Sequence, residues 1–458
     1  MTKFMKLFIF KHYRVLAICW LASALYCHPA LAADIMEAYR NAVDSDPQLR
    51  QAIANREAGQ ELKPQARALL LPNVSADANE RRVFNYNQST SDVPPVLRER
   101  PNSTYNNFQY EIVLNQPIYN READYRVRAA EASANRSDAD LVFAQQDLVV
   151  RVATLYFNVL AALDNLTFRI ADKNAIGRQL EQAKRRFEVG LITVTDVAEA
   201  QARYDLATAD EINARQTLAD AREALREVTG RYYEQINVLD EKAPLDPVKP
   251  ADPEAWVKIA LENNPQVQSA AYNAESSQEN IEVQRSGHYP KLDLQASKYK
   301  TNAFDLDTSA NQVGVVLNVP LFEGGLVSAK TREAAYQHEA AKEQLEQVQR
   351  QVVRQVRNSY QGLETARSRV KALQQAVISN RSSLEATQAG FDVGTRTIVD
   401  VLNAERDLLS TIRDLSISRY QYITNRLQLL QAAGQITGQK QIEAINAWLR
   451  PPKEKQPQ

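Results

Sequence analysis

Two stretches of this chain lack proline over lengths that no compact domain core needs. The first runs between Pro117 and Pro244 for 126 residues, and the second between Pro320 and Pro451 for 130 residues. Both are rich in Ala, Leu, Gln, Glu and Arg, which are strong helix formers, and apolar residues recur at spacings of three and four. At about 1.5 Å per residue, a helix from Pro117 to Gly190 would be on the order of 110 Å long. The sequence therefore predicts two long helical hairpins with coiled-coil seams.

The two helical stretches belong to two copies of one repeated unit. The motif Asp46-Pro47 is followed by a proline twenty-five residues after Pro47, and Asn264-Pro265 is followed by one at the same distance. Near the end of each long helix, Phe187-Glu188-Val189-Gly190 matches Phe391-Asp392-Val393-Gly394. Each copy is expected to fold as helix, strand, strand, long helix, turn, helix. We expect this division of the chain: signal peptide 1–32, first repeat 33–240, proline-rich connector 241–253, second repeat 254–440 and C-terminal tail 441–458.

Two short segments precede each predicted hairpin and alternate between apolar and polar residues, as β-strands do. The apolar positions are Val74, Ala76 and Ala78; Phe108, Tyr110, Ile112 and Leu114; Leu292, Leu294 and Ala296; and Val313, Val315, Leu317 and Val319. The alternation suits a water-filled barrel in lipid, and it suits a half-exposed sheet of a soluble protein equally well. In the membrane reading, four strands are too few, because the smallest single-chain barrels have about eight. Three chains would supply twelve.

The first thirty-two residues have the features of a secretory signal peptide. Positive residues precede an apolar run from Val15 to Cys27, and Ala30-Leu31-Ala32 resembles a cleavage site. Loss of this segment removes both cysteines, which excludes a disulfide framework and a cysteine nucleophile. No later apolar stretch approaches the ~20 residues of a membrane helix, so we expect a closed barrel to be the only spanning element.

The composition of the mature chain argues against several classes of function. Its net charge is about −5, because the whole chain carries −1 and the signal four positive charges, and this is no footprint for nucleic acid. Two histidines remain, His288 and His338, and they are not clustered. There is no phosphate loop and no metal-ligand spacing. We therefore expect no enzyme, no cofactor, no metal and no nucleic-acid partner.

The connection between the first pair of strands is longer than that between the second pair. From Pro72 to Pro117 there are 45 residues, against 30 from Pro290 to Pro320. The extra length is polar and rich in turn residues, and we expect a surface loop over 85–107. It could be a target for phages or antibodies, or inert decoration.

The two hairpin turns resemble the periplasmic tips of TolC-family outer-membrane factors. The second tip reads Val393-Gly394-Thr395-Arg396-Thr397-Ile398-Val399-Asp400-Val401-Leu402 and is nearly identical to that of the family's type member; the first reads Val189-Gly190-Leu191-Ile192-Thr193-Val194-Thr195-Asp196-Val197. The resemblance covers nearly the whole mature chain. It implies a mostly α-helical fold with membrane β-structure, in which a trimeric, shared twelve-stranded β-barrel is continued by a twelve-helix α-barrel of coiled coils. It also implies an outer-membrane channel with its helices in the periplasm.

The resemblance further implies a gate at the closed, periplasmic end. Arg396 matches the residue that bonds across to Thr195 and Asp196 and holds the coils shut, as a charge-assisted contact can. Phe391 stands where the family has a tyrosine whose hydroxyl would add a bond, so this chain departs from the pattern and we expect a looser gate. Alternatively, Arg396 is a solvated surface arginine.

The pore constriction is implied at Asp400, which matches a ring of three carboxylates that favours cations. A second acidic ring is expected three residues later, but this chain has Asn403 there, so we expect a weaker cation preference. Asp196 and Asp400 also stand at helix starts and could be plain N-caps, a role compatible with the gate. Gly190 and Gly394 are expected to end helices in the left-handed conformation.

The partners implied by the family are a periplasmic adaptor (a membrane fusion protein) and an inner-membrane transporter of the RND, ABC or MFS type. The duct itself is expected to be a homotrimer in outer-membrane lipid that exports drugs, toxic compounds or secreted proteins. The docking tips for the adaptor are expected at Val189, Gly190 and Leu191 and at Val393, Gly394 and Thr395. An envelope-anchored trimeric coiled-coil adhesin or scaffold is the alternative, although it leaves the two strand pairs unexplained.

Overall fold

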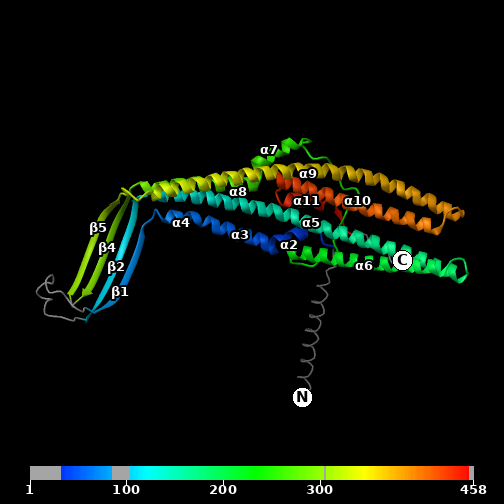
Figure 1. Ribbon diagram of the computed structural model, residues 1–458, viewed down its shortest axis with the longest axis horizontal. Helices are drawn as coiled ribbons and strands as arrows, with labels where there is room; N and C mark the ends of the chain where they lie inside the picture. The colour runs from blue at the N-terminus through cyan, green and yellow to red at the C-terminus, as the bar shows by residue number, and fades with distance from the viewer. Residues whose placement is uncertain (1–31, 85–103, 304–305, 453–458) are drawn as a thin grey trace, which may run out of the picture. The chain divides into compact units, whose positions relative to one another are not determined.

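A computed structural model describes residues 32–84, 104–303 and 306–452 (Figure 1). Its helices form two hairpins of nearly equal size. The first pairs α5 (Arg121–Glu188, 68 residues) with α6 (Val194–Thr229, 36 residues). The second pairs α9 (Leu326–Asp392, 67 residues) with α10 (Ile398–Ala432, 35 residues). The matching lengths follow the sequence repeat, and each long helix measures about 100 Å at ~1.5 Å per residue.

The helical segment expected at the start of each repeat is interrupted. Breaks occur at Asp46-Pro47 and at Asn264-Pro265, because proline lacks an N–H and readily begins a new helix. Asp46 Oδ2 accepts a hydrogen bond from the backbone N–H of Leu49 at 2.9 Å, and Asn264 Oδ1 accepts one from that of Gln266 at 2.8 Å. The resulting helices are α2 (Ile35–Ser45) and α3 (Pro47–Gln60) in the first repeat and α7 (Pro253–Asn263) and α8 (Pro265–Arg285) in the second. A turn at Glu61 separates α3 from the short helix α4 (Leu62–Ala68).

Contacts divide the chain into two compact units, each built from both repeats. One contains residues 51–143 and 261–352, and the other contains residues up to 50, 144–260 and residues from 353 onward. Helices α5 and α9 contribute residues to both units. The four strands formed by the alternating segments lie in the first of these units, and the hairpin tips lie in the second.

The first unit holds a four-stranded antiparallel sheet in the order β1-β2-β4-β5. The register aligns Val74 with Leu114, Leu114 with Ala296 and Ala296 with Val313, so one apolar row crosses all four strands. All four predicted strands are present and are longer than the alternating segments indicated. Their bounds are β1 (Asn73–Phe84), β2 (Thr104–Tyr119), β4 (Lys291–Ala303) and β5 (Leu306–Asn318).

The second unit is centred on aromatic side chains of α5 and α10. Phe157 stacks on Tyr420 with ring centroids 5.5 Å apart, and Tyr156 Oη donates a hydrogen bond to the carbonyl of Asn237 at 2.8 Å. All three rings are buried. The sequence did not indicate three small elements of this unit, namely β3 (Val238–Leu239), which pairs with β6 (Leu449–Arg450), and α11 (Gln439–Asn446). Residue 441, the predicted start of the C-terminal tail, lies inside α11.

The proline-rich connector, residues 241–253, packs against the second hairpin. Tyr422 Oη donates to the carbonyl of Asp246, and Tyr360 Oη donates to that of Ala251 at 2.7 Å. Val248 is buried. The connector is therefore held by side chains of α9 and α10 in addition to the stiffness of its prolines.

One helix among the described residues is long and apolar enough to cross a membrane by length and composition alone. It is α5, which contains an 18-residue window with a mean hydropathy of 1.3. The expectation that no stretch approaches this limit was therefore too strict. However, 61% of that window is buried inside the protein, as in the core helix of a soluble domain. The signal-peptide prediction and most of the predicted 85–107 loop lie outside the described residues.

Candidate functional site

The two hairpin tips have the same backbone structure. In the first tip, Gly190 has a φ of 74°, its N–H donates to the carbonyl of Phe187, and the N–H of Leu191 donates to that of Arg186, both at 2.8 Å. This pair of bonds around a left-handed glycine is a Schellman motif, which satisfies the last carbonyls of a helix. The second tip repeats it at Gly394, with a φ of 80°. The left-handed helix ends predicted for both glycines are confirmed.

Each tip then starts its next helix with a capping box. Asp196 Oδ2 accepts hydrogen bonds from the N–H and the hydroxyl of Thr193, both at 2.8 Å. Asp400 Oδ2 accepts the corresponding bonds from Thr397 at 2.9 and 2.8 Å. The alternative that the aspartates are N-caps was therefore wrong in position: Thr193 and Thr397 are the N-caps, and each aspartate is the third helical residue. Threonine takes the N-cap position because the oxygen of its short side chain can accept a hydrogen bond from the backbone N–H three residues ahead.

Both aspartates are held in the charged form by these bonds. The backbone N–H and then the hydroxyl of Thr193 lower the pKa of Asp196. The same two groups of Thr397 lower the pKa of Asp400, with a smaller contribution from the nearby Arg396 guanidinium. Hydrogen bonds to a carboxylate favour its ionised form. Capping and a negative charge at the tip thus coexist.

Arg396 lies beside Gly390 at the second tip. Its backbone N–H donates to the Gly390 carbonyl at 3.1 Å, and its Cγ would lie 2.8 Å from a Cβ added at Gly390. A side chain at Gly390 would therefore displace the stem of Arg396. Among the described residues of one chain, Arg396 forms no ion pair with Asp196, and Thr195 and Asp196 are exposed. The bonds predicted between them stay a prediction.

The six predicted docking residues are all exposed at the tips. Val189, Leu191 and Val393 expose 70%, 67% and 74% of their surfaces. Phe391 is also exposed, and its ring carries no hydroxyl for a latch. The tips can therefore offer apolar contacts to another protein.

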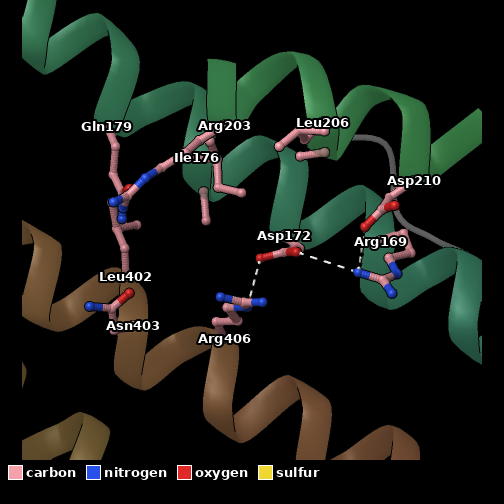
Figure 2. A pocket seen from close by; sticks show the side chains of 12 residues that line it. Arg169, Asp172, Ile176, Gln179, Arg203, Leu206, Asp210, Leu402, Asn403 and Arg406 are labelled. Atoms are coloured by element: carbon pink, nitrogen blue, oxygen red, sulfur yellow. Dashed lines mark ion pairs between the residues drawn. The ribbon is translucent and has the colours of Figure 1, made fainter. Parts of the chain in front are cut away.

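Asn403 lies one turn after Asp400 and lines a cavity of about 330 Å³ between α5, α6 and α10 (Figure 2). Charged side chains surround this cavity. Arg406 Nε is 3.2 Å from Asp172 Oδ1, and Arg169 Nη1 is 2.9 Å from Asp210 Oδ2. Figure 2 shows Asp172 between Arg406 and Arg169. Near it, Arg178 Nη2 on α5 is 2.9 Å from Glu405 Oε2 on α10.

These charged residues were not predicted as site residues from the sequence. A signal was present, because Asp172 and Arg406 stand among apolar neighbours that face the same cavity, such as Ile176 and Leu402. A charge in an apolar seam is costly unless it is paired, so each residue predicted a partner. The sequence alone could not say which one.

Comparison with known proteins now identifies the family. The sequence pattern described as "Outer membrane efflux protein" matches residues 38–231 and 256–435. The chain belongs to the outer membrane efflux protein family. It is 39% identical to the outer membrane protein TolC of Vibrio cholerae, over 92% of this chain and 94% of that protein. It is 32% identical to the alkaline protease secretion protein AprF of Pseudomonas aeruginosa, over 93% of this chain and 90% of that protein.

A solved structure of an outer membrane channel shares the fold. The Campylobacter jejuni CmeC outer membrane channel matches with a TM-score of 0.74 at 17% sequence identity, covering 91% of this chain and 90% of that chain. As a member of this family, the protein is an outer-membrane channel protein of the efflux and secretion class. The resemblance seen at the tips is confirmed, and the alternative of an adhesin is not supported. The relatives are channels rather than enzymes.

Proposed function

We propose that three copies of this chain assemble into one exit duct through the outer membrane. The observation that carries the proposal is the four-stranded sheet. Its edges are β1 and β5, and among the described strands each pairs on one side only. Unpaired edges cannot be satisfied in lipid, and a single-chain membrane barrel needs about eight strands. Three copies close a ring of twelve strands if β5 of one copy pairs with β1 of the next.

The two faces of the sheet support this arrangement. Val313 and Leu317 expose 77% and 61% of their surfaces on the apolar face. The opposite face carries a polar row in which Asn115 pairs with Gln295. An exposed apolar face on a single chain indicates a lipid or protein partner, and a polar inner face suits a water-filled bore.

We further propose that the twelve long helices of the trimer continue the bore and that Arg396 closes it. Because Arg396 has no ion pair with Asp196 among the described residues of one chain, the latch would join neighbouring subunits. Asp196 accepts both of its capping bonds at Oδ2, which leaves Oδ1 to face a guanidinium of the next copy. Such a contact would be a charge-assisted hydrogen bond.

The exported cargo would pass from an inner-membrane transporter of the RND, ABC or MFS type through a periplasmic adaptor that engages the exposed tips. The description of the family as an outer membrane efflux protein supports small compounds as cargo, and the name of the relative AprF, an alkaline protease secretion protein, supports secreted proteins. We propose small toxic compounds and secreted proteins as the classes of cargo.

The proposal is tested by adding the purified protein to planar lipid bilayers. Long-lived pores of small conductance are expected, together with a trimer in cross-linking and mass measurements. A monomer in detergent that leaves the bilayer current unchanged would refute the duct. Deletion of β5, which removes one edge of the sheet, should abolish both trimer and pores.

Asp400→Ala should reduce the preference of the pore for cations. Its carboxylate, tripled in the trimer, would set the potential of the narrow end. The bonds from Thr397 lower the pKa of the Asp400 carboxyl within one chain, whereas three like charges in a ring would raise it; the cation preference of the unmodified protein should therefore be present at neutral pH and be lost as the pH falls and the carboxylates become protonated. Reversal potentials in a salt gradient measure this. Asp392→Ala, at an exposed aspartate of the same tip, is the control; equal selectivity in both variants would reduce Asp400 to a cap.

A further inference from the structure

Two ion pairs join the two hairpins of one chain close to the second tip. Arg406 on α10 contacts Asp172 on α5 at 3.2 Å, and Glu405 on α10 contacts Arg178 on α5 at 2.9 Å. The two α10 residues are adjacent and the two α5 residues are six positions apart, so the pairs lie along one seam. We call these four residues the inter-hairpin clamp.

The Asp172 pair is the stronger half of the clamp. Asp172 exposes only 6% of its surface and its Oδ1 accepts no hydrogen bond, so the stabilisation of its charge depends on the guanidinium of Arg406, whose Nε lies 3.2 Å from Oδ1. Arg169 contributes at 4.0 Å but is itself paired with Asp210 on α6 at 2.9 Å. Loss of Arg406 would therefore leave a buried carboxylate with only a shared, more distant cation, and that is unfavourable.

The clamp breaks the internal symmetry of the chain. At the offset that relates the two tips, Asp172 and Arg178 correspond to Ala376 and Ser382 in the second repeat, and Glu405 and Arg406 correspond to Gln201 and Ala202 in the first. None of these four counterparts is charged. The charges are thus no general requirement of the coiled coil; they occur at one seam, the seam inside the chain.

The clamp also lies where it would control the constriction. Arg406 follows Asp400 by six residues on the same helix, and Asn403, between them, lines the cavity beside Asp172 (Figure 2). Any movement that carries the start of α10 away from α5 has to separate both ion pairs. The cavity gives the side chains room when they part.

We propose that the inter-hairpin clamp positions the start of α10 in the closed state, independently of Arg396. Arg396 would restrain the seam between subunits, and the clamp would restrain the seam inside each subunit. Opening the duct then requires that both the Arg396 contact and the ion pairs of the clamp break. This inference rests on the proposed duct and assigns four positioning residues to its gate.

The exposed half of the clamp allows a charge-swap test in planar bilayers. Glu405→Arg and Arg178→Glu each place like charges together, and each should raise the open-state occupancy at least about threefold, a size typical of a half-exposed pair. The double variant restores opposite charges and should return to within a factor of two of the unmodified protein. Arg406→Gln should open the pore further. Arg203→Gln is the control, since Arg203 lines the same cavity but pairs with Glu199 on its own helix at 2.6 Å.

A second measurement separates the clamp from the duct. Amide hydrogen exchange over residues 398–406 should accelerate in Glu405→Arg and recover in the double variant, whether or not pores form. Recovered exchange without any pore would retain the clamp and refute the duct. Pores whose occupancy and exchange are the same in the single and double variants would refute the clamp and retain the duct.

Discussion

Arg396→Ser is expected to turn the small pore into one that is open most of the time. A hydrogen bond to a charged group contributes about 1.5–3 kcal/mol, and every 1.4 kcal/mol is about a tenfold change in an equilibrium. Removing the guanidinium from all three subunits should therefore shift the closed–open equilibrium by at least about tenfold. Single-channel recordings would show a larger mean conductance and longer open times.

Two further variants show whether the effect belongs to the latch. Arg381→Ser removes an exposed arginine from α9, the helix that leads into the same tip, and should leave the conductance unchanged. Gly390→Ala keeps the charge but places a Cβ 2.8 Å from the Arg396 Cγ, so it should open the gate in the same direction by displacing Arg396. An unchanged conductance in Arg396→Ser would remove this residue from the gate.

Asp46→Ala is expected to cause the largest loss of stability. Asp46 exposes 1% of its surface, and its carboxylate receives two hydrogen bonds from Arg151 at 2.8 and 3.2 Å and one from the N–H of Leu49. Breaking a buried ion pair by removing one partner costs about 3–5 kcal/mol. The midpoint of guanidinium unfolding, followed by the helical circular dichroism signal, should fall accordingly.

The source of this loss can be resolved with matched variants. Asp46→Asn keeps an N-cap, as Asn264 does at the corresponding position of the second repeat, but takes away the buried carboxylate partner of Arg151, which then keeps only Asp147, at 3.3 Å on its own helix. Combining it with Arg151→Met should restore part of the stability, because no guanidinium then lies beside the neutral amide, and the carboxylate that loses its partner, Asp147, is exposed to water. Glu57→Ala, which breaks an exposed pair with Arg56, should cost less than about 1 kcal/mol. A cost for Asp46→Ala no greater than that of Glu57→Ala would contradict the argument.

The helices at the start of each repeat show what could not be predicted from local sequence patterns. Asp46-Pro47 and Asn264-Pro265 were visible as repeat markers, but their role as helix breaks depends on a cap bond that propensity does not report. The same holds at the tips. Spacing suggested capping by Asp196 and Asp400, whereas Thr193 and Thr397 hold the N-cap positions.

The long hairpins, the four strands and the glycine turns could be read from the sequence because each depends on neighbours a few residues away. Helical periodicity, strand alternation and a left-handed glycine are properties of short segments. Only the tertiary structure decided which charges meet. Arg178 and Glu405 are separated by 227 residues, and Asp172 finds Arg406 only once the two hairpins have packed. Partners so far apart are selected by the packing of the seam, and the pattern of either segment does not say which residue of the other segment it will meet.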